Sequence, residues 1–367
     1  MPVPLRRRAL ITLLAPALGV SASLAAGPSR RPASAGGGGE VLDSLEWLAF
    51  CSRFLRSDGR VIDTSNGGIS HSEGQGWALL CAERAEDRAT FDQVLTWTRR
   101  SLGRRGDALF AWRWRPDGTG GAVDDPNNAT DGDLMIAWAL LRAGQRWRDG
   151  DYGAQGVAIA RDVLRLLVRQ VGDETVLLPG AAGFEQREHV VLNPSYYAFP
   201  ALRALAQAVP DPLWLKLAAD GLGLLRRARF GRWGLPPDWV ALSRAGGRAA
   251  PAPGWPPRFS YDAVRVPLYL AWAGLGREPA VANAVRFWSD PQHRRLPAWA
   301  DLASDGISPY GAPAGIRAIV QLATARHGEG GAVFPSLPSV NETRDYYSAA
   351  LTLLVRLAWR DSQGAAI

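Results

Sequence analysis

The sequence predicts an all-α protein. After residue 40, about eleven segments carry apolar residues at i, i+3 and i+4, the pattern of helices with one buried face. Strand signals are few and short, as in "TVLLPG" at 175–180, and no repeat of 34 or 40 residues is visible, which disfavours an ordinary solenoid. A closed ring of helix hairpins with loops at both rims would bury so many apolar faces, although several helical folds satisfy the same count.

The predicted helices follow one another with loops rich in Gly, Pro and Asp between them, and we expect no strands between the helices. Pro267 inside one helical pattern predicts a kink. The Pro- and Gly-rich stretch 243–257 predicts a mobile loop. In chain order the helices are expected at residues 41–56, 74–86, 89–103, 130–146, 153–170, 194–208, 211–228, 261–275, 278–289, 311–326 and 343–359.

The N-terminal part of the chain is typical of an exported protein. Residues 1–26 combine three arginines, the apolar run "ALITLLAPALGV" and the small-residue stretch "SASLAAG", which together predict a signal peptide. Pro16 and the shortness of the apolar run argue against an uncleaved membrane anchor. We expect a flexible lead-in at 27–39, a single domain at 40–367, no membrane span in the mature chain, and a periplasmic or secreted location.

The formal charge of +7 overstates the charge of the predicted domain. Five of these charges come from arginines before residue 40, where no acidic residue stands, so the domain keeps 7 − 5 = +2. That balance gives no electrostatic footprint for nucleic acid. The five arginines are Arg6, Arg7, Arg8, Arg30 and Arg31.

The sequence offers no metal or cofactor motif. Cys51 and Cys81 lie in separate apolar segments, where buried free thiols are favoured over a disulfide, although an oxidising compartment would permit pairing. A calcium loop starting at Asp125 is rejected because Ile136 stands where the bidentate Glu is needed. The motifs G-x-S-x-G, H-E-x-x-H and G-x-x-x-x-G-K-[ST] are absent from the sequence. We therefore expect neither a metal nor a cofactor.

Carboxylates at loop-to-helix junctions are the candidate catalytic groups. Glu73 lies in "SHSEGQGWALL", where Ser72 and Gln75 fit a capping box and neighbouring glycines permit close approach of backbone or ligand. Its structural alternative is a surface Glu that complements the helix dipole. Asp262 lies in "RFSYDAVRVPLYLAW", and Arg265 on the same helix face could form an ordinary structural ion pair with it.

A third acidic junction lies in "DDPNNATDGDL". Thr130 would be the N-cap, and Asp131 and Asp133 would complement the dipole in the first turn.

Several tryptophans lie in predicted loops, where they have less reason to belong to a core. Flat amphipathic rings in such places suit stacking on sugars. Carboxylates together with loop aromatics therefore suggest glycoside hydrolysis. These loop residues are Trp112, Trp114, Trp233, Trp239 and Trp255.

The stretch "ATDGDLMIAWALLRAGQRW" resembles the signature of glycoside hydrolase family 8, and "SEGQGWALLCAERAEDRATFDQVLTWT" resembles the segment of that family that bears the acid. "LLPGAAGF", "LNPSYY", "PPDWV" and "SYDAVRV" are similar, in order, to the branch of periplasmic endo-1,4-β-glucanases associated with bacterial cellulose synthase. The resemblance runs from about residue 45 to residue 359. It implies an (α/α)6 barrel with a substrate cleft across one rim and an inverting mechanism.

By the match to the family motifs, Glu73 would be the general acid, Asp262 the general base, and Asp131 would position the sugar at the scissile bond. The acid should be partly desolvated, with Asp131 as its neighbour, while Asp133 caps and braces the helix. Tyr196, Arg265, Trp112, Trp114 and Trp239 are expected to bind substrate, as is Tyr346 or its neighbour Tyr347.

The resemblance implies β-1,4-glucan as the substrate. We expect a monomer, with a cellulose synthase complex as a candidate partner. Chitosan and xylan are alternative substrates within the same family. A non-catalytic glycan-binding scaffold is an alternative of a different class.

Overall fold

The computed structural model describes residues 44–118, 120–328 and 336–364, so the predicted signal peptide and lead-in lie outside the described residues. Eleven α-helices lie within these ranges, close to the predicted segments. They are α1 (Ser44–Phe54), α2 (Ser72–Arg84), α3 (Arg88–Leu102), α4 (Thr130–Arg146), α5 (Gly150–Leu167), α6 (Phe199–Ala208), α7 (Pro212–Arg227), α8 (Arg265–Trp272), α9 (Pro279–Trp288), α10 (Ala314–His327) and α11 (Tyr346–Gly364).

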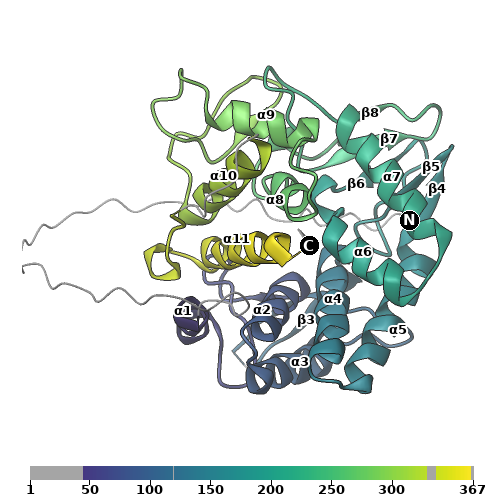
Figure 1. Cartoon of the computed structure of the whole chain (residues 1–367). Helices are drawn as coiled ribbons and strands as arrows, with labels where there is room; N and C mark the ends of the chain where they lie inside the picture. The colour runs from purple at the N-terminus through teal and green to yellow at the C-terminus, as the bar shows by residue number, and fades with distance from the viewer. Residues whose placement is uncertain (1–43, 119, 329–335, 365–367) are drawn as a thin grey trace, which may run out of the picture.

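The inner helices form a closed ring. Helix α2 packs on α4, α4 on α6, α6 on α8, α8 on α10, α10 on α11, and α11 returns to α2. Helices α3, α5, α7 and α9 pack outside α2, α4, α6 and α8 in turn, and α1 packs against α11. Figure 1 shows this arrangement, with the inner helices gathered around the middle of the molecule. The predicted ring of helix hairpins is therefore confirmed.

Burial explains why each chain segment occupies its layer. The inner helices α2 and α4 are buried over most of their length, whereas the outer helices α5 and α7 bury only one stripe. Apolar burial at about 25 cal/mol per Å² drives both layers onto one continuous core. In the part of the chain that the structure describes, no helix is both long and apolar enough to cross a membrane.

The prediction that no strands lie between the helices is wrong. Short antiparallel strands connect the helices and form four small sheets, ordered β1-β2-β3, β4-β5, β6-β7-β8 and β10-β9. Strands of two to seven residues are too brief to leave a clear alternation in the sequence, apart from the signal at 175–180, which overlaps β5. The partners of β1, β6 and β9 lie far along the chain. The strands are β1 (Ser70–His71), β2 (Ala111–Arg115), β3 (Ala122–Asn128), β4 (Val168–Val171), β5 (Glu174–Leu177), β6 (His189–Leu192), β7 (Val240–Ser243), β8 (Ala249–Pro251), β9 (Arg258–Phe259) and β10 (Ala300–Asp301).

Three local predictions are corrected by the structure. The predicted mobile loop at 243–257 contains strand β8, which pairs with β7 in a hairpin. The predicted kink at Pro267 is absent because α8 begins at Arg265, so the proline lies in the first turn, where a missing N–H costs little. The helix predicted at 194–208 is split into the 3-10 helix η1 (Pro194–Tyr196) and α6.

Candidate active site

Glu73 lies in the first turn of α2, directly after β1. The predicted capping box is wrong: His71 is the N-cap, and its Nδ1 accepts a hydrogen bond from the Gly74 amide at 3.0 Å. Gln75 is instead buried, and its Oε1 accepts from the Val61 amide at 2.7 Å. Helix α2 is thus anchored from both sides at the turn that carries Glu73.

The glycines around Glu73 allow close packing of protein on protein. A Cβ atom on Gly76 would lie 2.7 Å from the Cβ of Met135, and one on Gly132 would lie 2.7 Å from the backbone nitrogen of Glu73. A Cβ on Gly74 would lie 2.5 Å from the hydroxyl oxygen of Tyr346. These glycines therefore let α2 approach α4 and α11 closely enough to bring their N-terminal ends into one site.

Asp131 and Asp133 lie in the first turn of α4, as predicted, but Thr130 is not the N-cap residue of that helix. Ala129 is the N-cap residue and makes no side-chain cap, while the Thr130 hydroxyl donates to the Leu178 carbonyl at 2.6 Å. Asp133 is fully buried and accepts from the Phe110 amide at 2.9 Å and from the Asn128 side chain at 2.7 Å. Asp133 therefore connects α4 to the residue before β2 and to the last residue of β3, and it does not cap the helix.

Arg265, the first residue of α8, joins the three candidate carboxylates. Its Nη2 lies 2.6 Å from Oδ1 of Asp262, and its Nη1 lies 3.5 Å from Oδ2 of Asp131. The same Nη1 contacts Oε1 of Glu73. Three carboxylates that are distant in the sequence thus meet at one guanidinium.

This cluster is only partly open to solvent. The side chain of Arg265 is 3% exposed, against 17% for Glu73 and 24% for Asp262. The guanidinium also donates to the Ser195 hydroxyl at 3.1 Å, and its carbon lies 5.6 Å from the centre of the Trp77 ring. A planar guanidinium suits such a position, since it stays charged and can serve several acceptors at once. The predicted partial desolvation of Glu73 is confirmed.

A second pair of interacting side chains, His71 and Asp63, lies next to Glu73. Nδ1 of His71 is 3.9 Å from Oε2 of Glu73, and Nε2 of the same ring is 3.6 Å from Oδ2 of Asp63. Burial by itself raises the pKa of Asp63, but the hydrogen bonds from His71, Asn66 and the Ser65 amide bring that pKa below its usual value. Asp63 is therefore an ionised partner for His71.

The two neighbouring tyrosines at the start of α11 serve opposite sides of the site. The ring of Tyr346 lies edge-on to His71, on the Glu73 side, with 5.7 Å between ring centres. The hydroxyl of Tyr347 donates to the carbonyl of Tyr261, the residue before Asp262. Tyr196 is fully buried, and its ring lies 6.3 Å from that of Trp239. Substrate binding by Tyr196 and Tyr346 stays a prediction.

Of the tryptophans predicted to lie in loops, two lie in a strand and two others are buried. Trp112 and Trp114 lie in β2, with the Arg113 guanidinium 4.2 Å from the centre of the Trp112 ring. Trp239 is only 4% exposed and stacks on the half-buried Trp255 with 4.1 Å between ring centres. The remaining loop residue, Trp233, is buried against Phe287. Burial therefore leaves Trp255 better placed than Trp239 to offer a ring face.

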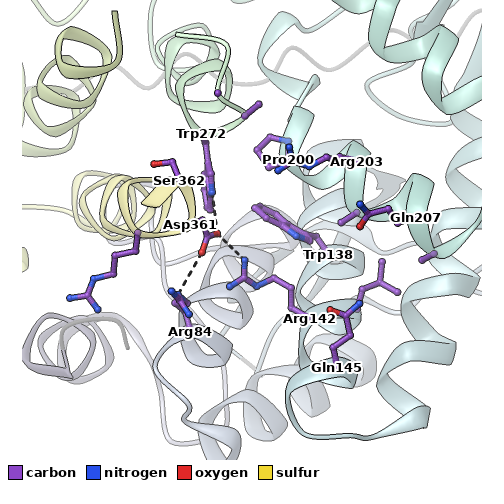
Figure 2. A pocket seen from close by; sticks show the side chains of 16 residues that line it. Arg84, Trp138, Arg142, Gln145, Pro200, Arg203, Gln207, Trp272, Asp361 and Ser362 are labelled. Carbon is purple, nitrogen blue, oxygen red and sulfur yellow. Dashed lines mark hydrogen bonds and ion pairs between the residues drawn. The ribbon is translucent and has the colours of Figure 1, made fainter. Parts of the chain in front are cut away.

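A cavity of about 620 Å³ lies at the opposite ends of the inner helices, among Trp138, Arg142, Trp272 and Asp361. Figure 2 shows Arg142 and Arg84 directed at Asp361 across this cavity. The carboxylates around Arg265 do not line it, so it is separate from the candidate active site.

Both cysteines are free, as favoured from the sequence, with Cys81 buried and Cys51 half-buried.

Carboxylates from separate parts of the chain that meet at one rim of a helical barrel supply the pair of carboxyl groups that glycoside hydrolysis uses. The family model of glycosyl hydrolases family 8 matches residues 1–361. The chain belongs to this family, and its fold is the (α/α)6 barrel.

Individual relatives agree with this assignment. A probable endoglucanase of Novacetimonas hansenii is 46% identical over 313 residues, which cover 85% of this chain and 90% of the relative. An endoglucanase of Cellulomonas uda is 41% identical over 277 residues, covering 75% of this chain and 76% of the relative. The solved structure of an endo-β-1,4-glucanase from Acetobacter xylinum has a TM-score of 0.81 at 44% identity, and the match covers 87% of this chain and 98% of that one.

Sequence reasoning missed the residues that support the carboxylates. His71 directly precedes the acid-bearing motif and Asp238 lies in the motif "PPDWV", yet neither position has a local pattern that reveals its partner. The partners of His71 are Asp63 and Glu73, and those of Asp238 are the amides of Ser260 and Ala263.

Proposed function

We propose that this protein is an endo-acting β-1,4-glucanase that inverts the configuration at the anomeric carbon. The observation that carries the proposal is the meeting of Glu73, Asp131 and Asp262 at the guanidinium of Arg265. The endoglucanase names of relatives that are more than 40% identical support glucan as the substrate.

In this proposal Glu73 gives its proton to the glycosidic oxygen as the bond to the anomeric carbon breaks. A water molecule attacks the same carbon from the opposite face and gives its proton to Asp262. An inverting enzyme needs about 6.5–9.5 Å between the two carboxyl groups to leave room for that water. Glu73 and Asp262 contact different nitrogens of one guanidinium, so both carboxyl groups border the same site.

Asp131 is proposed to hold the sugar next to the scissile bond. Its side chain is 6% exposed and lies 3.5 Å from the guanidinium that contacts both the acid and the base. A carboxylate held in this way can accept hydrogen bonds from sugar hydroxyls and favour a distorted ring, which contributes several kcal/mol in glycoside hydrolysis.

We further propose that the chain has a signal peptide at residues 1–26, a lead-in at 27–39 and one catalytic domain at 40–367, and that it works as a periplasmic or secreted monomer. A role in bacterial cellulose synthesis and export fits these features. The support is the arginine-plus-apolar leader and the resemblance of the motifs described above.

The test is proton NMR of residues 27–367 acting on cellopentaose, with the anomeric signals of fresh products followed in time. Early α-anomer from the β-linkage supports inversion, and early β-anomer refutes it. Glu73→Gln and Asp262→Asn are expected to lose hydrolysis, while Glu73→Gln keeps binding. Wild-type rates in both variants would end the assignment, and activity on chitosan or xylan oligomers alone would change the substrate.

A further inference from the structure

Asp238 is a buried carboxylate that the proposed mechanism does not use. It lies just before β7 and is 9% exposed. Its Oδ1 accepts from the backbone N–H of Ser260 at 2.9 Å and from that of Ala263 at 2.8 Å. Its own backbone N–H donates to the Arg258 carbonyl at 2.6 Å. Asp238 therefore forms hydrogen bonds with the backbone on both sides of Asp262.

The segment that carries Asp262 is a turn, so its position depends on such contacts. Residues 260–264 lie between β9 and α8 and belong to neither element. The Tyr347 hydroxyl holds the Tyr261 carbonyl, and the Arg265 amide donates to the Asp262 carbonyl at 3.1 Å. Asp238 is the side chain that serves two amides of this turn at once.

We propose that Asp238 is a positioning residue for the general base Asp262. By accepting two amides that flank the base, it fixes the turn so that the Asp262 carboxylate faces the attacking water. A misplacement of about 1 Å in a reacting group costs on the order of 10²-fold in rate, so a two-point clamp on this turn has a large effect on turnover. The inference rests on the proposed function, since it assigns Asp238 to the base of that reaction.

Two substrates separate the base step from the acid step. Cellopentaose needs both Glu73 and Asp262. With β-cellobiosyl fluoride, the bond from the anomeric carbon to fluorine breaks without protonation and fluoride leaves. A water molecule forms the new bond to that carbon, and its proton goes to Asp262. Glu73→Gln should therefore lose activity on cellopentaose and keep activity on the fluoride, while Asp262→Asn should lose both.

Asp238→Ala is expected to lower kcat by about 10²-fold on both substrates with KM unchanged, because both amides lose their acceptor. The matched control is Asp238→Asn, whose side-chain oxygen can accept both amides and should restore kcat close to the wild-type value. If Asp238→Ala does not fold, Asp238→Ser makes the same comparison, because its hydroxyl is too short to reach both amides.

The inference is overturned if Asp238→Ala keeps wild-type kcat on the fluoride, since the base then needs no clamp. It is equally overturned if Asp238→Asn loses as much as Asp238→Ala, or if the loss lies in KM alone. Failure of the proposed function has a different signature, which is wild-type activity in both Glu73→Gln and Asp262→Asn.

Discussion

Asp133 should make the stability of this protein depend on pH in an unusual direction. Its side chain is fully buried in the first turn of α4. Burial raises the pKa of Asp133 from 3.8 to about 8, although hydrogen bonds from Asn128 and the Phe110 amide oppose that rise. The folded state therefore binds a proton at Asp133 more tightly than the unfolded state does. A carboxyl of this kind favours folding at low pH, and its contribution is lost as the pH rises from about 4 toward 8.

The size of the effect follows from the two pKa values. Between pH 5 and pH 7 the folded state keeps the proton and the unfolded state does not, so the free energy of unfolding falls by about 1.4 kcal/mol per pH unit, or about 2.7 kcal/mol in all. That is a large fraction of the roughly 5–15 kcal/mol that holds a typical protein folded.

The control variant is Asp133→Asn, which cannot titrate. Urea unfolding of both proteins at pH 5 and pH 7 isolates Asp133, because all other titrating groups cancel in the difference between them. We expect the wild type to lose about 2–3 kcal/mol relative to the variant over this interval. Parallel pH dependence in the two proteins would refute the burial argument, and a wild type that gains stability with pH would reverse its sign.

Three further predictions concern packing, charge and thiol reactivity. Gly132→Ala should destabilise the protein by about 1–3 kcal/mol and reduce hydrolysis, because the added Cβ would be forced into the first turn of α2. The control Gly150→Ala, with open space around the added Cβ, should be nearly neutral in thermal unfolding. Arg265→Lys should keep the charge but lose simultaneous contact with the three carboxylates. We therefore expect kcat on cellopentaose to fall by at least about tenfold, and a wild-type kcat would contradict the role of the guanidinium. Burial raises the pKa of Cys51 to about 12 and also raises the pKa of Cys81. Iodoacetamide at pH 8 should therefore label both thiols in urea and neither in the folded protein. Rapid labelling of the folded protein would contradict this prediction and show that the thiols are accessible.

The sequence by itself determined the helices and the identity of the candidate carboxylates. A helix with one buried face leaves a local apolar period, so segments such as α4 and α7 could be located to within a few residues. Glu73 and Asp262 could be selected because each lies at a loop-to-helix junction inside a recognisable motif.

The short strands and the ion pairs around Arg265 could be found only in the tertiary structure. Strands of two to four residues leave no clear period, so β1, β8 and β9 could not be read from the sequence. The capping predictions failed for a related reason: Gln75 and Thr130 had the local pattern of caps, but partners elsewhere in the fold compete for their side chains.

Closure of the ring decided the contacts of the site. Arg265 follows Asp262 by three residues, and the sequence could suggest that pair, but its contacts with Asp131 and Glu73 span 134 and 192 positions of the chain, by the residue numbers. The same closure separated Tyr346 from Tyr347, which sequence reasoning left unresolved. Local patterns encode which face of a helix is buried; which side chains then meet at the ends of different helices is set only when those helices pack together.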